Sequence, residues 1–151
     1  GSSSLMVFNI DHFKQVNDES GHAGGDEALK LVAGSARKML RSRDLVGRLG
    51  GDEFIALLPD TTINDALHVA DRMVRHVDKE RRSLQQSPLS LSFGVVQIQA
   101  GESLLEATHR ADQALQEAKR QGRGRAPSHR RRRNRGRRMT AGSDFHCRGH
   151  S

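Results

Sequence analysis

The sequence predicts an α/β domain in which helices cover a mixed central sheet that contains an antiparallel hairpin. Short apolar runs rich in strand-forming residues alternate with longer segments whose apolar residues recur three or four positions apart, as one face of a helix requires. Two of the short runs flank a pair of glycines, a pattern typical of a hairpin. Strands and helices that alternate in this way favour a layered fold with helices on a sheet.

Residues 5–10 form the first expected strand, an apolar run that ends at polar residues, as in a buried strand whose end opens onto a site. Residues 45–49 and 54–58 form the expected hairpin around Gly50 and Gly51, because a glycine pair supplies the positive φ values of tight turns. A last strand is expected over residues 89–98, broken at its glycine.

Three segments have helical periodicity. The first covers residues 29–40 and follows a glycine-rich stretch, and the second covers residues 66–77. The third begins at a capping box formed by Ser103 and Glu106 and is expected to end near Arg120. Together these elements give the order strand, helix, hairpin, helix, strand, helix.

The 151 residues, 34% of them hydrophobic, suit a single compact domain. Residues 1–4 resemble a cloning scar and linker, residues 5–126 form the expected domain, truncated at its N-terminal side, and residues 127–151 form a basic tail. No apolar run approaches the roughly 20 residues needed to span a bilayer. The lone Cys147 fits a reducing compartment, so we expect a cytoplasmic domain, which a missing N-terminal part could anchor to a membrane.

The net charge of +7 is unevenly distributed. Residues 119–151 hold twelve basic residues against one acid, whereas residues 1–118 hold thirteen against seventeen. The arginine-rich stretch at 130–138 cannot bury a core, and we expect disorder there. It could serve as an arm for nucleic acid or an anionic membrane, but a solvated extension is the favoured interpretation, and nucleic acid is not an expected partner.

The hairpin Gly50-Gly51-Asp52-Glu53-Phe54 carries the chemistry. Two adjacent carboxylates follow glycines that leave no side chains to block a bulky ligand. Mg²⁺ prefers such hard oxygen ligands and is usually held by one or two carboxylates together with substrate phosphates. Taken alone, the same turn is more often an ordinary hairpin tip.

Further segments between about Leu5 and Arg125 decide between these interpretations, because their order and spacing resemble the GGDEF family of diguanylate cyclases. The matching segments are Asn9-Ile10-Asp11-His12-Phe13-Lys14-Gln15-Val16-Asn17-Asp18, Gly21-His22, Gly25-Asp26, Arg48-Leu49 before the hairpin, Leu58-Pro59-Asp60-Thr61, Ser90-Leu91-Ser92-Phe93-Gly94-Val95, Ala111-Asp112-Gln113-Ala114-Leu115, Ala118-Lys119 and Gly122-Arg123. The resemblance implies a fold like that of nucleotide cyclases and polymerase palms, and the condensation of two GTP molecules into cyclic di-GMP.

The resemblance also implies roles for individual residues. Gly50, Gly51, Asp52 and Glu53 would form the catalytic hairpin, with Glu53 a metal ligand or the group that helps deprotonate the attacking 3′-hydroxyl. The substrate-binding residues would be Phe13, Lys14, Asn17, Asp26, Lys119 and Arg123, of which Asn17 and Asp26 match the donors and acceptors of guanine and the cations contact phosphates. Mg²⁺ or Mn²⁺ would bind at Asn9, Ile10, Asp52 and Glu53. Two domains would face each other in a homodimer, since each holds one GTP.

Asn9 departs from the family pattern, which has an aspartate there. An amide oxygen can coordinate a dication, but a neutral ligand holds it less strongly than a charged one. Asp11 matches the family's other acid, with no reason to take over the missing role. The alternative to the cyclase is therefore a GTP or cyclic di-GMP receptor with a weakened metal site.

Arg41 and Asp44 stand where the family places its Arg-x-x-Asp inhibitory site for cyclic di-GMP, and Arg72 resembles the second arginine of that site. Guanidinium groups suit phosphates and the guanine edge, although surface ion pairing is the commoner role of such a motif. Relatives usually carry an upstream sensory or receiver domain, so one is an expected partner in a full-length protein.

Overall fold

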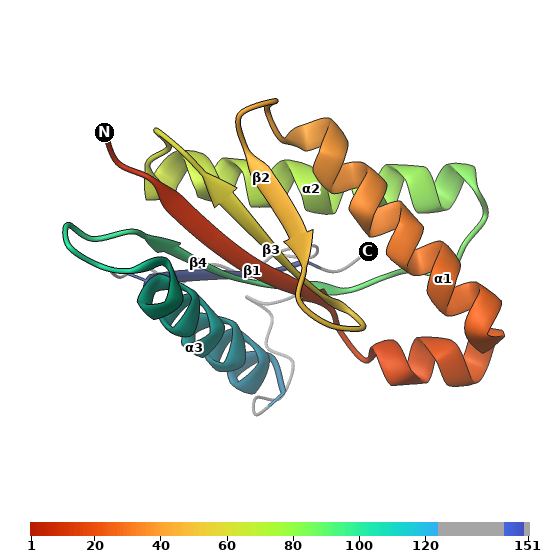
Figure 1. The fold of residues 1–151 in the computed structure, drawn as a ribbon. Coiled ribbons are helices and arrows are strands. Elements are labelled where there is room, and N and C mark those ends of the chain that lie inside the picture. The colour runs from red at the N-terminus through yellow and green to blue at the C-terminus, as the bar shows by residue number, and fades with distance from the viewer. Residues whose placement is uncertain (124–143, 150–151) are drawn as a thin grey trace, which may run out of the picture.

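The computed structural model describes residues 1–123 and 144–149 (Figure 1). Within them, the backbone forms five strands and three helices. In chain order these are β1 (Ser4–Ile10), α1 (Phe13–Met39), β2 (Leu45–Arg48), β3 (Glu53–Leu58), α2 (Ile63–Ser83), β4 (Leu91–Gln97), α3 (Leu104–Arg123) and β5 (Asp144–Gly149).

The strands form one sheet in the order β2-β3-β1-β4-β5, and every described pairing is antiparallel. The α/β class and the antiparallel hairpin are thus confirmed, while no two neighbouring strands of the described residues are parallel, where a mixed sheet was expected. The cause lies in the topology. Each helix that crosses between strands, α1 from β1 to β2 and α2 from β3 to β4, joins two strands of the same direction that are separated by one strand of the other unit. This is the split βαβ arrangement.

Helices cover both faces of the sheet (Figure 1). Met6, Phe8 and Ile10 on β1 belong to the larger core beneath α1 and α2. Leu5 and Val7, which alternate with them, belong to a smaller core beneath α3. This is the period-2 alternation of a strand buried on both faces. Odd-numbered positions of β1 therefore face α3.

The helix α1 begins earlier than expected. The glycine-rich stretch was predicted to precede a helix over residues 29–40, but residues 13–20 are helical too, and the helix is interrupted at Gly21, where φ is 74°. Such a conformation is strained for other residues and easy for glycine. The kink divides α1 into two arms, visible as a sharp bend in Figure 1.

The other two helices exceed the predicted ranges by a few residues at their ends. Thr62 caps α2, since its side chain accepts a hydrogen bond from the Asp65 N–H at 3.2 Å. Ser103 caps α3 in the same way, accepting from the Glu106 N–H at 3.1 Å, as predicted. No helix in the described part of the chain is long and apolar enough to cross a membrane.

The sequence predicted a break in the last strand at Gly94. The structure instead places Gly94 within β4. A Cβ at this position would lie 1.9 Å from the backbone oxygen of Ala111 on α3. The glycine therefore permits α3 to pack directly on the sheet, which fixes the distance between that helix and the strands.

The strand β5, which falls within the expected basic tail 127–151, extends the sheet beside β4. It covers hydrogen-bonding groups that would otherwise form an open edge of β4. The remainder of that expected tail, including the arginine-rich stretch 130–138, lies outside the described residues.

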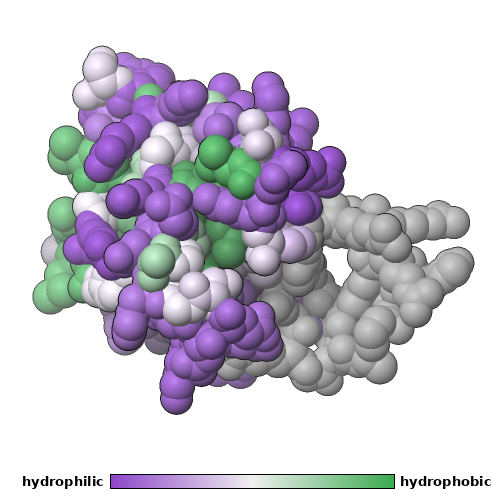
Figure 2. Space-filling model, turned by 90° about the vertical axis from the view of Figure 1, so that its right-hand side faces the viewer, coloured by the Kyte–Doolittle hydropathy of each residue, from purple (hydrophilic) through white to green (hydrophobic). Residues whose placement is uncertain are grey.

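Figure 2 shows the side of the molecule to the right of Figure 1. Its coloured surface is mostly hydrophilic, and hydrophobic side chains form small groups separated by hydrophilic ones. Single apolar groups of this kind are ordinary on a folded domain.

Candidate functional site

The site lies where the hairpin meets the end of β1. In the sheet register, Asn9 is opposite Glu53 on one side and Ser92 on the other. Residues directly opposite each other in an antiparallel pair share a face, so all three lie on the face covered by α3. Asp112 and Lys119, two helical turns apart on α3, act electrostatically on Glu53. The register and the helix thus bring the site together from four elements.

The hairpin tip, residues 49–52, is open. A Cβ added to Gly50 or Gly51 would meet no atom within 4 Å. Neither residue has a positive φ, contrary to the expectation, because a four-residue connection needs no primed two-residue turn. Arg48 holds the tip by donating to the carbonyl oxygen of Gly50 at 3.1 Å and to that of Gly51. The glycines are therefore suited by their lack of side chains rather than by their φ values.

Negative charge is concentrated around Glu53. Burial raises the pKa of the Glu53 carboxyl, and the charge of Asp112, together with a hydrogen bond between the two side chains, raises that pKa further. Asp52 adds a smaller effect in the same direction, while the ammonium group of Lys119 lowers the pKa. The effects of Asp112 and Asp52 on this pKa show that negative charge gathers around Glu53. A cation that binds among these carboxyl groups would relieve their mutual repulsion.

The Asn9 side chain contributes a free oxygen to this cluster. The residue is only 7% exposed, and its Oδ1 atom is buried without a hydrogen-bond partner in the described part of the structure. Buried polar atoms are rarely left unpaired, so such an atom points to a ligand. The described residues contain no group of three His, Cys, Asp or Glu side chains that could hold a metal. A dication at this site would therefore need the Asn9 amide oxygen beside Asp52 and Glu53, and that donor set fits Mg²⁺.

Asp11, the second acid of the first strand, has a structural environment. It is 6% exposed and accepts hydrogen bonds from the hydroxyl groups of Ser90 and Ser92, both at 2.6 Å. These bonds tie the end of β1 to the start of β4.

The residues expected to read guanine lie at the kink of α1. A Cβ on Gly25 would lie 1.8 Å from Asn17 Oδ1 and 3.3 Å from Phe13 Cζ, so both side chains rest against the Gly25 backbone. Asp26, the next residue, is exposed. Positions 17 and 26 would lie about 13 Å apart along a straight helix. The bend at Gly21 is what brings the two arms together.

The cations expected to contact phosphates are only partly placed. Lys119 lies close enough to Glu53 to lower its pKa. Lys14 is exposed in the first turn of α1, immediately after the end of β1. The side chain of Arg123 lies outside the described part of the structure.

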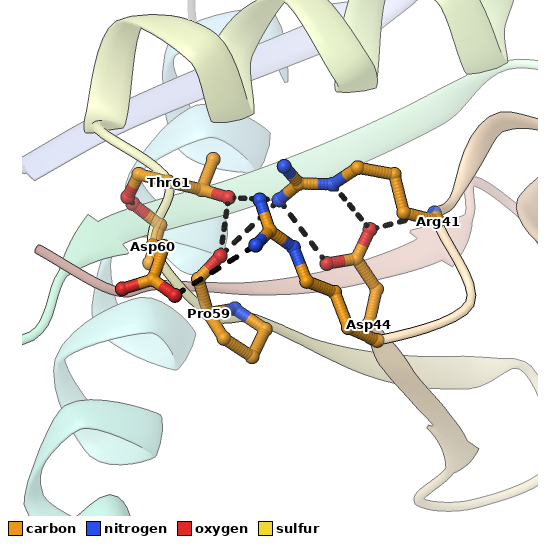
Figure 3. A network of polar contacts seen from close by, with 7 residues as sticks. Arg41, Asp44, Pro59, Asp60 and Thr61 are labelled. Carbon is orange, nitrogen blue, oxygen red and sulfur yellow. Dashed lines mark hydrogen bonds and ion pairs between the residues drawn. The ribbon is translucent and has the colours of Figure 1, made fainter. Parts of the chain in front are cut away.

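Arg41 and Asp44 form a closed network with the connection between β3 and α2 (Figure 3). Asp44 accepts a hydrogen bond from the Arg41 backbone N–H at 2.7 Å and pairs with its guanidinium at 3.4 Å. Arg41 also donates to the Pro59 carbonyl oxygen at 3.2 Å and to the Thr61 hydroxyl. The Asp44 side chain is only 2% exposed, so in this conformation it is engaged by Arg41 rather than open to a ligand.

Arg72 is exposed on α2. Glu27 accepts a hydrogen bond from Gln86, and Ser35 bonds to His76, so α1 and α2 run antiparallel. The end of α1 therefore lies beside the first half of α2. Arg72 lies in that half of α2, and Arg41 follows the end of α1, so both arginines belong to the same end of the helix pair.

Asp112 was missed as a site residue. The sequence analysis used it only as part of a matching segment, although Asp112 and Lys119 are seven residues apart and so share one face of a helix. Combining that face with the carboxylates of the hairpin would have identified it. Thr61 gave no such signal, since its contact with Arg41 spans 20 residues.

Antiparallel strands with carboxylates at the end of a split βαβ sheet, and helices on both faces, define the class of nucleotide-cyclase and polymerase-palm-like domains. Residues 1–125 match the family described as "Diguanylate cyclase, GGDEF domain". The chain belongs to this family.

Relatives with curated names agree with this assignment. The chain is 40% identical over 127 residues to diguanylate cyclase DgcP of Pseudomonas aeruginosa, covering 83% of this chain and 19% of that protein. It is 39% identical over 123 residues to diguanylate cyclase DgcM of Escherichia coli K12, covering 81% of this chain and 30% of the relative. The chain thus spans less than a third of either protein.

Solved structures show the same fold. The active GGEEF domain of a diguanylate cyclase from Vibrio cholerae is 32% identical, with a TM-score of 0.74 over 80% of this chain and 78% of that chain. The GGDEF domain of DgcB from Caulobacter crescentus in complex with c-di-GMP is 31% identical, with a TM-score of 0.74 over 82% of this chain and 75% of that one.

Proposed function

We propose that this domain condenses two GTP molecules into cyclic di-GMP. The observation that carries the proposal is the unpartnered buried oxygen of Asn9 beside Glu53, at the open end of the hairpin. It provides an oxygen-rich site for a dication next to a surface without side chains, where phosphates can approach. The family to which the chain belongs supplies the substrate class.

In this proposal, Asn17 and Asp26 hold the guanine base, because an amide and a carboxylate together match its O6 acceptor and its N1 and N2 donors. Phe13 packs beside them against Gly25. The guanine base, which is one end of the nucleotide, would lie at the kink of α1. Lys14, Lys119 and Arg123 would bind the phosphates.

A dication, Mg²⁺ or Mn²⁺, would be held by Asp52, Glu53, the Asn9 amide oxygen and the backbone of Ile10, and it would neutralise charge that develops at the reacting phosphorus. Asp112 keeps the Glu53 carboxyl in place through their hydrogen bond. If Glu53 serves instead as the base, its raised pKa favours uptake of the proton that the attacking hydroxyl loses.

The chemistry requires two copies of the domain. Each holds one GTP, whose 3′-hydroxyl oxygen attacks the α-phosphorus of the other GTP. The hydroxyl proton leaves to a base, the bond between the α-phosphorus and the bridging oxygen breaks, and pyrophosphate departs. Two such steps give one cyclic di-GMP and two pyrophosphates. We therefore expect a homodimer as the active form.

A second function, the binding of cyclic di-GMP, is favoured by the basic corner formed by Arg41, Asp44 and Arg72. Guanidinium groups bind phosphates and the guanine edge in bidentate fashion. In an active enzyme, cyclic di-GMP bound at this corner would inhibit its own synthesis. In a domain whose metal site is weakened by Asn9, it would make the protein a cyclic di-GMP receptor, and GTP could serve as the ligand of the other site.

In a longer protein, the domain of residues 5–126 would follow a sensory or receiver domain that brings two copies together. A cytoplasmic location would suit its nucleotide substrate. The basic segment 127–151 has no assigned part in this function.

The test is incubation of the purified chain with GTP and Mg²⁺, with the nucleotides separated by chromatography. We expect cyclic di-GMP and pyrophosphate in a ratio of about one to two, as the two displacements require. Asp52→Asn should abolish the product, whereas Glu106→Gln, which removes an exposed carboxylate remote from the hairpin, should not. Tight binding of cyclic di-GMP without any synthesis would support the receptor and refute the cyclase.

A further inference from the structure

The corner formed by Arg41, Asp44, Pro59 and Thr61 contains a contact that the Arg-x-x-Asp motif does not include. Thr61 lies between β3 and α2, 20 residues after Arg41, and is only 4% exposed. Its hydroxyl group accepts a hydrogen bond from Arg41 Nη2 and donates one to the Pro59 carbonyl oxygen at 2.9 Å. Figure 3 shows these groups pointing toward one another.

Arg41 is held on one edge by this network. Its Nη2 atom is within 3.4 Å of Asp44 Oδ1 and 3.2 Å of the Pro59 oxygen, and its Nε atom is 3.5 Å from Asp44 Oδ2. The side chain nevertheless remains 47% exposed, whereas that of Asp44 is 2% exposed. One edge of the guanidinium is therefore anchored, and the rest of it is presented to solvent.

Anchoring of this kind matters for affinity. A free arginine side chain has many rotamers, and ordering it on binding opposes association. Asp44 constrains Arg41 from its own turn, three residues away. Thr61, together with the Pro59 carbonyl oxygen that its hydroxyl group also contacts, adds a fixed point from a different part of the fold. It is buried, and its own carbonyl oxygen accepts a hydrogen bond from Ser4 on β1 at 2.8 Å.

We propose that Thr61 is a positioning residue for a guanine nucleotide with phosphodiester groups, bound at the Arg41 corner. The buried hydroxyl group orients the guanidinium so that its exposed part meets a phosphate oxygen or the guanine edge. Asp44 then acts mainly by holding Arg41. The inference rests on the proposed binding of cyclic di-GMP at this corner, and it adds a residue outside the motif.

The experiment is calorimetric titration of the full chain with cyclic di-GMP. Thr61→Val removes the hydroxyl and keeps the shape, and we expect about tenfold weaker binding, the order of one hydrogen bond to a charged group. Thr61→Ser keeps the hydroxyl and should bind within about twofold of the wild type on the same grounds. Thr108→Val, the same chemical change on α3, is the matched control and should leave the affinity unchanged.

A second measurement separates positioning from general destabilisation. The ¹⁵N relaxation of the Arg41 side-chain Nε should show greater mobility in Thr61→Val than in the wild type, and Thr61→Ser should restore the order. If Thr61→Val does not fold, Thr61→Ala removes the same hydroxyl without placing a methyl group in its position.

The outcomes are distinguishable. Thr61→Val binding as tightly as the wild type, or more tightly, overturns the role of Thr61 and leaves the binding site standing. Wild-type protein that does not bind cyclic di-GMP, or an Arg41→Ala variant that binds it normally, overturns the proposed site and with it this inference.

Discussion

Replacing Asn9 by aspartate introduces a negative charge beside Glu53, and its effect should depend on metal. Asn9 is nearly buried and stands directly opposite Glu53 in the register. In metal-free protein, a second carboxylate at this position adds to the repulsion that Asp112 and Asp52 already exert on Glu53, against the opposing effect of Lys119. With a dication bound, the same carboxylate becomes a stronger ligand than the amide it replaces.

The magnitude follows from the strand pairing. Side chains directly opposite each other in an antiparallel pair lie about 5 Å apart. Two unit charges at about 5 Å with an effective dielectric constant of about 20 repel by about 3 kcal/mol. For a domain of this size that lowers the melting temperature by roughly 6–12 °C. Asn9→Asp should therefore melt well below the wild type in chelator.

The assay is thermal unfolding followed by circular dichroism, in chelator and in millimolar Mg²⁺. We expect Mg²⁺ to recover most of the loss for Asn9→Asp and to change the wild type less, because a ligand that binds only the folded state stabilises it. Asn64→Asp, the same change at an exposed position, is the control and should respond to neither condition. An Asn9→Asp variant that melts like the wild type in chelator, or that ignores Mg²⁺, refutes this account of the site.

Three further predictions concern packing and pH. Gly25→Ala places a Cβ 1.8 Å from Asn17 Oδ1 and displaces that side chain, so the affinity for GTP, measured by titration, should fall about tenfold or more while the fold survives. Gly94→Ala places a Cβ 1.9 Å from the Ala111 backbone oxygen, which cannot move aside as a side chain can. It should lower the free energy of unfolding in urea by about 3 kcal/mol. Hydrogen bonds from Arg110 and, second, from the Gln99 N–H lower the pKa of Glu102 from 4.5 to about 2, so these contacts stabilise the fold above pH 4.5 and their contribution is lost as the pH falls toward 2. The melting temperature of Glu102→Gln should therefore lie below that of the wild type at pH 7, and the difference should shrink with acidification.

Matched variants make these outcomes decisive. Gly34→Ala adds a methyl group to α1 where no atom lies within 4 Å, and should stabilise the fold slightly. If it costs as much as Gly94→Ala, the close approach of α3 is not the cause. Glu106→Gln removes an exposed charge from α3 and should leave the acid transition of the wild type unchanged. Unaltered GTP affinity in Gly25→Ala would contradict the placement of Asn17 in the guanine site.

Periodicity and composition were sufficient for the main elements. The strand over residues 5–10, the hairpin and the cap at Ser103 depend on neighbouring residues, which a sequence displays directly. The first arm of α1 was missed because Gly21, Gly24 and Gly25 are typical of a loop. Only Gly21 leaves the helical conformation, and the other two lie within the helix.

The site depended on contacts between distant residues. The kink at Gly21 and the close packing of Asn17 on Gly25 are tertiary facts without a local signal. The same holds for the bond from Arg41 to Thr61, which spans 20 residues of the chain. The family resemblance assigned residues such as Asn17 and Asp26 to a common site. Only the structure shows how these residues lie relative to one another.

The most direct test of the central claim is a crystal structure of the chain with Mg²⁺ and a GTP analogue whose α-phosphate cannot be displaced. We predict that the guanine contacts Asn17 and Asp26, with a dication bound by the Asn9 oxygen, Asp52 and Glu53. A nucleotide found only at Arg41, with the hairpin free of metal, would contradict the claim.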